Sequence, residues 1–208
     1  MSSEASALNP HIAQSETTEL FGKASLGKIG MWIFLLSDTL SFVGLLLGYG
    51  ILRAGSTVWR HPEEPALNLV LAGVLTLVLM LSSVTMMIAF SAAVDGNRKR
   101  TQTFLGVTIA GGVLFLIGQA KEYVSLIHEG LIFGHSAYAS TFYAVTTFHG
   151  LHVFGGVVYL TFILVRSLRQ GNSGDWREIE LVDLFWHFVD LVWIFVFSFI
   201  YLIPATLS

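Results

Sequence analysis

Apolar residues fill five long stretches of the chain, separated by short polar segments. The stretches cover approximately residues 29–52, 67–94, 104–127, 139–168 and 181–202. Each has the roughly 20 residues that a helix needs to cross a hydrocarbon core about 30 Å thick. Charged and turn-forming residues fill the separators, as in residues 60–65 (RHPEEP) and 95–100 (DGNRKR). The pattern predicts an all-α, polytopic transmembrane helical bundle of about five spans.

The composition indicates that lipid surrounds most of the chain. Only 12% of the 208 residues are charged and the mean hydropathy is +0.70, whereas soluble domains carry about 25% charged residues. The chain has no cysteine, which excludes disulfides and thiolate ligands. Its net charge of −3 is small, and we expect no nucleic-acid partner. We predict a polar cytoplasmic tail over residues 1–27 and a five-span transmembrane domain over residues 28–208.

Basic residues predict the orientation, because cytoplasmic loops carry an excess of Lys and Arg. With the N-terminus inside, the outer side carries two basic residues, Arg53 and Arg60, and the inner side carries eight. The inner set is Lys23, Lys28, Arg98, Lys99, Arg100, Arg166, Arg169 and Arg177. We therefore predict the N-terminus in and the C-terminus out. Lys28, Arg98 and Arg166 are candidate contacts for anionic phospholipid headgroups, although topology alone also accounts for their positions.

Ionisable residues inside the predicted spans are the main candidate functional residues, because such groups usually face a bundle interior or a partner. Asp38 and Asp190 each lie about nine residues, or roughly 14 Å, into their spans. His149 falls near the same middle layer, and His152 and His187 lie somewhat closer to the cytoplasmic side. The pairs 149/152 and 187/190 are three residues apart, so each pair shares a helix face. We predict that these five residues form a buried polar network.

Lys121 and Glu122 form a second candidate site, an outer-interface polar pair late in the third span. At that depth the long lysine side chain can extend to the membrane surface.

Several interpretations of the histidines in the fourth and fifth spans stay open at this level. They could make hydrogen bonds between helices, or contact protons or lipid. A metal could bind His149, His152, His187 and one carboxylate, since imidazole and carboxylate suit zinc, iron or copper. Haem would need histidines facing each other from two helices at matched depth, and the depths here fit poorly.

Four segments resemble subunit III of the haem-copper oxidases, the cytochrome c and quinol oxidases. Residues 140–143 (STFY) with 148–153 (FHGLHV) are similar to the family's penultimate-span signature, and residues 186–193 (WHFVDLVW) to its final-helix motif. Residues 118–123 (GQAKEY) resemble its glutamine-to-glutamate-tyrosine segment, and residues 32–38 (WIFLLSD) its first shared helix. The five spans resemble the short bacterial form, which lacks the first two spans of the seven-span long form. Asp38 stands where the long form has a carbodiimide-reactive glutamate.

The resemblance implies an accessory subunit of an oxidoreductase complex that holds no redox centre, metal or catalytic residue of its own. Haem and copper are expected in its partner, the catalytic subunit I, and other oxidase subunits are expected as further partners. The implied roles are to stabilise the catalytic subunit, to bind phospholipid and to support proton uptake for oxygen reduction coupled to proton pumping. The implied location is the bacterial cytoplasmic (inner) membrane. These implications favour hydrogen bonds between helices as the role of the buried polar residues.

Two other functions remain open from the sequence. Related five-span proteins accompany nitric oxide reductases, so the chain could be an accessory protein of that complex. It could also be an independent proton or ion transporter, because buried Asp38, Lys121 and Glu122 are typical of transport pathways. Against the transporter, the sequence shows no pair of broken, inverted-repeat helices.

Overall fold

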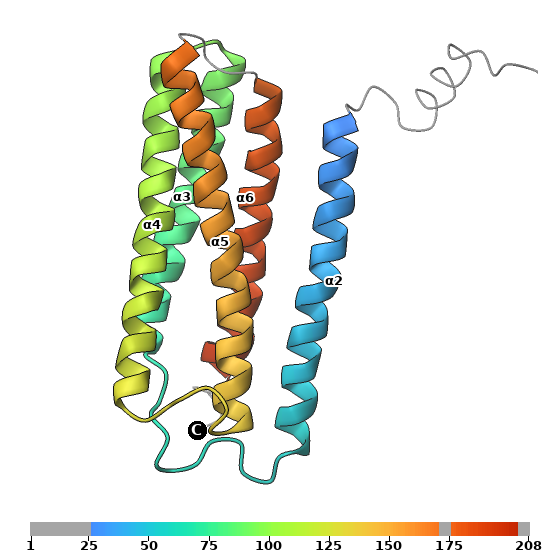
Figure 1. Ribbon diagram of the computed structural model, residues 1–208, viewed down its shortest axis with the longest axis vertical. Coiled ribbons are helices and arrows are strands. Elements are labelled where there is room, and N and C mark those ends of the chain that lie inside the picture. The colour runs from blue at the N-terminus through green and yellow to red at the C-terminus, as the bar shows by residue number, and fades with distance from the viewer. Residues whose placement is uncertain (1–25, 171–175, 204–208) are drawn as a thin grey trace, which may run out of the picture.

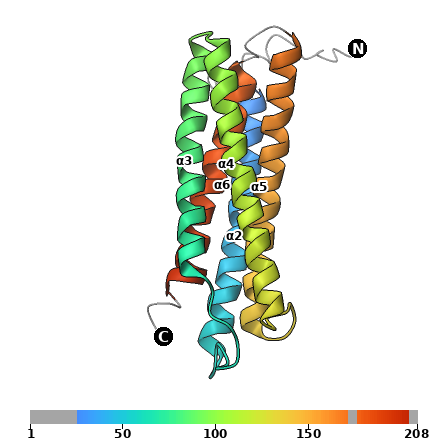
Figure 2. The same cartoon turned by 90° about the vertical axis from the view of Figure 1, so that its left-hand side faces the viewer.

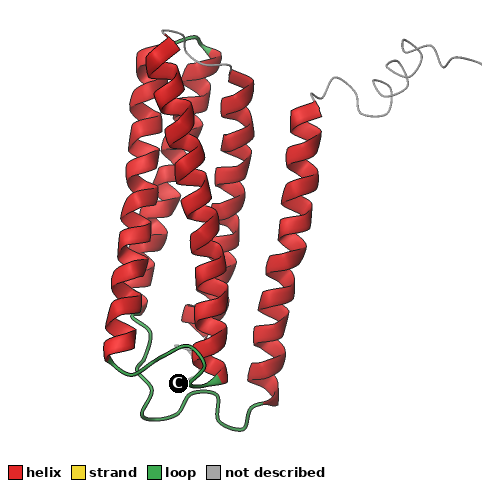
Figure 3. Ribbon diagram, viewed as in Figure 1, coloured by secondary structure: helices red, strands yellow, loops and turns green. Residues whose placement is uncertain are grey.

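The computed structural model describes residues 26–170 and 176–203 as a set of long helices joined by short loops (Figures 1 and 3). The helices are α2 (Leu26–Gly55), α3 (Leu69–Val94), α4 (Arg98–His128), α5 (Ala137–Gln170) and α6 (Trp176–Val196), with the π-helix η1 (Phe197–Leu202) continuing α6. Five helical segments are long and apolar enough to cross a membrane. The prediction of an all-α protein with about five spans is therefore confirmed. Most of the predicted tail, residues 1–25, lies outside the described residues.

Polar caps explain where the helices begin and end relative to the apolar stretches. Asn68 accepts a hydrogen bond from the backbone N–H of Leu71 (3.0 Å), so α3 starts at residue 69. Asn97 accepts one from Arg100 (3.3 Å), so α4 starts six residues before the apolar stretch that predicted it. Between the two helices, Gly96 has a φ of +71°, the left-handed conformation that closes many helix C-termini.

Four of the helices form an antiparallel bundle, and the fifth packs on its side. Helix α3 contacts α4 and α6, and α5 completes the bundle by contacting α4 and α6. Helix α2 lies outside this bundle and contacts α6 and α5 (Figures 1 and 2). The loop α3–α4, the end of α5 and the start of α6 lie at the end where α2 begins, whereas the loops α2–α3 and α4–α5 lie at the other end.

Helix α2 is the least packed of the five helices. In its most apolar 18-residue window 17% of the residues are buried, against 39–44% in the other helices. Its few buried residues are Leu35, Asp38, Phe42 and Tyr49, which face the bundle. Because so little of α2 is covered, a small number of contacts determines how it attaches.

Two tryptophans on α6 fill the centre of the bundle. Trp186 is 0% and Trp193 2% exposed. A buried indole N–H needs an acceptor, and both acceptors are hydroxyls on α3. Trp186 donates to Ser82 Oγ (3.1 Å) and Trp193 to Thr76 Oγ1 (2.9 Å). Each indole therefore joins apolar packing to one interhelical hydrogen bond.

Gly112 on α4 allows Trp186 to occupy this position. A Cβ atom at residue 112 would lie 2.7 Å from Trp186 Cη2 and 2.6 Å from Val157 Cγ2. Since both neighbours belong to the core, neither can move away cheaply. The absence of a side chain at residue 112 thus permits the close approach of α4, α5 and α6.

We predict that Gly112→Ala lowers the stability of the protein by about 1–3 kcal/mol, the usual range for overpacking a filled core. The measurement is the apparent melting temperature of the detergent-solubilised protein. Gly106→Ala is the matched control, because it lies on the same helix and a Cβ there meets nothing within 4 Å. Equal melting temperatures for the two variants would contradict this account of the core.

Candidate functional site

The closest contact between ionisable residues at mid-membrane depth joins α2 to α5. Oδ1 of Asp38 lies 3.1 Å from Nε2 of His152, and both side chains are largely buried. The rings of Phe42 and Phe148 lie 5.2 and 4.8 Å from the imidazole. The pair is therefore enclosed by aromatic rings, which restrict its access to lipid.

The geometry of His152 requires that the pair holds one proton between its two groups. Nδ1 of His152 lies 2.7 Å from the backbone carbonyl of Phe148, and a carbonyl only accepts, so Nδ1 carries a proton. If Nε2 and the Asp38 carboxylate both lacked a proton, two acceptors would face each other at 3.1 Å. The pair is thus either imidazolium and carboxylate or imidazole and carboxylic acid. In either form one exchangeable proton lies between α2 and α5.

His149 lies one turn from His152 but has different surroundings. It is 0% exposed, and its ring centroid lies 4.8 Å from that of Trp193 and 5.7 Å from that of Phe115. Neither ring nitrogen has a hydrogen-bond partner among the described residues. His149 therefore acts as an aromatic packing residue at the centre of the bundle, rather than as a member of a polar chain.

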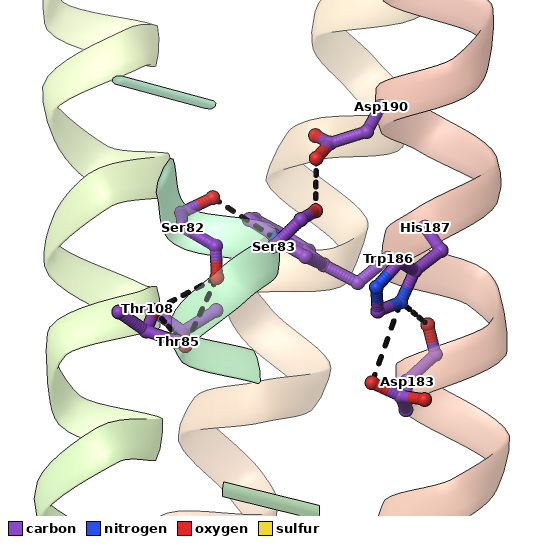
Figure 4. Close-up of polar contacts among 8 residues, drawn as sticks. All are labelled: Ser82, Ser83, Thr85, Thr108, Asp183, Trp186, His187 and Asp190. Carbon is purple, nitrogen blue, oxygen red and sulfur yellow. Dashed lines mark hydrogen bonds and ion pairs between the residues drawn. The ribbon is translucent and has the colours of Figure 1, made fainter. Parts of the chain in front are cut away.

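Asp190 takes part in a separate set of contacts between α6 and α3. It is 8% exposed, and its Oδ2 accepts a hydrogen bond from the Ser83 hydroxyl (Figure 4). The neighbouring Ser82 accepts from Trp186, and Thr85 exchanges a 2.8 Å hydrogen bond with Thr108 of α4. Helix α3 therefore supplies most of the hydroxyl groups that make these interhelical contacts.

His187 does not reach these contacts, although it lies three residues before Asp190. Its Nδ1 contacts Asp183, one turn earlier on the same helix, at 2.8 Å from the backbone oxygen and 3.3 Å from Oδ1 (Figure 4). Its side chain is 44% exposed. The five residues predicted as one network thus lie at separate positions. Among them, Asp38 and His152 form a pair.

Glu122 and Lys121 point in different directions and do not pair. Glu122 is 3% exposed and its Oε2 accepts a 2.8 Å hydrogen bond from the Tyr201 hydroxyl, whereas Lys121 is exposed. Both are predicted to lie at the outer interface, and they face different surroundings because consecutive residues on a helix are about 100° apart. Glu122 instead ties α4 to η1 inside the protein.

The glutamine and tyrosine of the GQAKEY segment are further polar residues that sequence reasoning had not selected. Gln119 donates to the Thr146 carbonyl (2.8 Å) and Tyr123 shares a 2.7 Å hydrogen bond with the Thr146 hydroxyl. Residues 119, 122 and 123 are three and four residues apart, the spacing of one helix face. That spacing was the available signal that all three face neighbouring helices.

The three basic residues predicted to meet lipid headgroups contact other parts of the chain. Lys28 lies 2.5 Å from Glu180 and Arg166 lies 2.7 Å from Glu178, as salt bridges. Arg98 donates to the backbone oxygen of Ser167 (3.1 Å). These contacts hold α2, α4, α5 and α6 together at one end of the bundle.

Within residues 26–170 and 176–203, no group of three His, Asp or Glu side chains is placed to hold a metal ion. The geometry supports helix–helix attachment and the sharing of a proton between Asp38 and His152.

Comparisons with known proteins agree with this architecture. The model of the family "Cytochrome c oxidase subunit III" matches residues 23–204. The chain is 35% identical to the probable cytochrome c oxidase subunit 3 of Nocardia farcinica, over 93% of this chain and 96% of that protein. It is 35% identical to cytochrome c oxidase subunit 3 of Synechocystis, over 94% and 84% of the two chains. For the Corynebacterium diphtheriae protein the identity is 32%, over 94% and 97%. Since the family model and these relatives cover most of its length, the chain belongs to the cytochrome c oxidase subunit III family of multi-pass respiratory membrane proteins.

Proposed function

We propose that this protein is the non-catalytic subunit III of a bacterial haem-copper terminal oxidase, in which it stabilises the catalytic subunit, binds phospholipid and supports proton uptake. Haem and copper belong to the partner catalytic subunit in this proposal. The observation that carries it is the Asp38–His152 pair, because it attaches the poorly packed α2 and holds one proton within the membrane. The names of the relatives favour an oxidase over a nitric oxide reductase.

The proposed orientation places the N-terminus in the cytoplasm. Lys28, Arg98 and Arg166 lie at the end of the bundle where α2 begins, since their contacts join the ends of four helices there. Arg53 lies in the last turn of α2, at the other end. This segregation of basic residues is what the positive-inside rule requires of the proposed orientation.

A reporter that is active only in the periplasm is expected to be active when fused after Ser208. The same reporter inserted at Gly96, in the loop between α3 and α4, is the matched control and is expected to be silent. The measurement is reporter activity in intact cells. A silent fusion at Ser208 together with activity at Gly96 would reverse the proposed orientation.

An apolar groove between α2 and α6 is the proposed phospholipid site. Its volume is about 860 Å³, and apolar side chains such as Val43, Leu47 and Phe195 line it. Arg53 lies at its outer end, where one guanidinium nitrogen donates to the Tyr49 hydroxyl (3.1 Å). The remaining guanidinium N–H groups can bind a phosphate while an acyl chain occupies the groove. We therefore place the phospholipid here and not at the paired basic residues of the inner end.

We expect Arg53→Gln to lower the amount of anionic phospholipid that is retained by the purified complex, because it removes the charge at the end of the groove. Native mass spectrometry of the complex measures the retained lipid. Arg60→Gln is the matched control, since Arg60 carries the same charge on the outer side but does not line the groove. Equal loss in both variants would point to general surface charge and would contradict a site in the groove.

Asp38→Leu is expected to loosen this subunit from the oxidase by about tenfold or more, since a hydrogen bond to a charged group contributes about 1.5–3 kcal/mol. Subunit retention during purification and the number of turnovers before inactivation are the measurements. The haem absorption spectrum of the catalytic subunit is expected to be unchanged. His149→Ala should also weaken assembly, because it opens a cavity beside Trp193.

Two further variants separate attachment from proton transfer. In Asp38→Asn the amide can still donate a hydrogen bond to His152, but the pair no longer holds an exchangeable proton. This variant should therefore assemble normally and inactivate early. Ser37→Ala is the matched control and should leave the turnover lifetime unchanged, because the Ser37 hydroxyl donates within its own helix, to the Ile33 backbone oxygen (3.1 Å). Normal turnover lifetime in Asp38→Asn would refute the proton role, and a Soret band in the purified subunit alone would refute the non-catalytic assignment.

A further inference from the structure

His187 differs from the other ionisable residues of the membrane interior in its exposure. Its side chain is 44% exposed, whereas the side chain of Asp38 is 9% exposed and Asp190 and His149 are buried. It follows Leu181, the first residue of the apolar part of α6, by six residues, or about 9 Å along the helix axis. An imidazole facing only acyl chains at that depth is unfavourable. Its exposure therefore indicates that another molecule covers this part of α6.

Exposed apolar side chains continue the same face of α6. Leu191 and Ile194 follow His187 at four and seven residues, the spacing of one helix face, and they are 55% and 41% exposed. Leu191 also lines the groove between α2 and α6, so this face borders the proposed phospholipid site. Trp186 and Trp193 lie on the opposite side of the helix, inside the bundle. We call the surface of His187, Leu191 and Ile194 the α6 outer face. This face has one polar residue among apolar ones.

The contacts of His187 define which of its atoms is available to a partner. Nδ1 lies 2.8 Å from the backbone oxygen of Asp183 and 3.3 Å from its Oδ1 (Figure 4). The backbone oxygen accepts but cannot donate, so Nδ1 carries a proton. Nε2 is then the remaining hydrogen-bonding atom of an exposed ring. The contact with Asp183 also holds the ring in one orientation, which suits a specific hydrogen bond.

We propose that the α6 outer face is the docking surface for a transmembrane helix of another oxidase subunit, and that this helix presents a hydroxyl or amide side chain to Nε2 of His187. The inference rests on the proposed function, which supplies the complex, and adds which face binds and what chemistry recognises it. Hydroxyl and amide groups both donate and accept, so they match Nε2 whether or not it is protonated. Leu191 and Ile194 supply the apolar packing that such a helix pair needs.

A photo-crosslinking amino acid at position 194 tests the surface directly within the complete complex. We expect an adduct with another oxidase subunit, identified by mass spectrometry of the crosslinked band. Position 114 is the matched control, because Leu114 is 57% exposed on α4, and α4 lies across the bundle from α6 (Figure 1). An adduct with a second copy of this chain, an adduct with lipid alone, or equal adducts from positions 114 and 194 would overturn the proposal.

Substitution of His187 tests the polar contact. His187→Phe should weaken retention of this subunit about 3- to 20-fold, the range for one interhelical hydrogen bond in a bilayer. His187→Gln keeps a donor and an acceptor and should retain the subunit. Equal retention of both variants would contradict the hydrogen bond. Haem in the complex that copurifies with this subunit is measured first. A complex without haem contradicts the proposed function, whereas a haem-containing complex without the adduct at 194 contradicts only the docking surface.

Discussion

The structure depends on one constraint, which is that polar groups in hydrocarbon have no water to bind. Several ionisable and hydroxyl side chains of the spans therefore bond to side chains of neighbouring helices. The contacts of Trp186 with Ser82, of Glu122 with Tyr201, and of Asp190 with Ser83 all join different helices. Each contact gives a partner to a buried polar atom and at the same time helps to fix the register of two helices. Polar residues thus determine the arrangement of a protein whose packing is mainly apolar.

Helix α2 shows this division of roles most clearly. It buries little apolar surface, and contacts at three levels attach it to the rest of the protein. Lys28 binds Glu180 near the start of α2, Asp38 binds His152 near its middle, and Tyr49 packs against Trp59 near its end. Because apolar packing is sparse here, the groove between α2 and α6 can remain open along the C-terminal half of α2. The same weak packing that makes the polar contacts necessary leaves the groove in which we propose that an acyl chain binds.

His152 and His187 differ in the surroundings of their second ring nitrogen, Nε2. In His152 and in His187, Nδ1 contacts the backbone oxygen four residues earlier. Nε2 of His152 meets Asp38 inside the protein, and the resulting pair holds a proton. Nε2 of His187 belongs to an exposed ring on the α6 outer face. One local arrangement therefore serves an internal contact on α5 and, in our proposal, an external one on α6.

The sequence by itself determined the class of the protein, the five spans and the residues that carry the family resemblance, because hydrophobic length and charge are properties of single segments. It also identified Asp38, His149, His152, His187 and Asp190 as candidate polar residues within the spans. It did not determine how they pair. Shared depth suggested one network, but rotation of each helix places His149 among aromatic rings and His187 outside the bundle. Only the tertiary structure decided these partners, since helix rotation follows from how all the helices pack, including the close approach at Gly112.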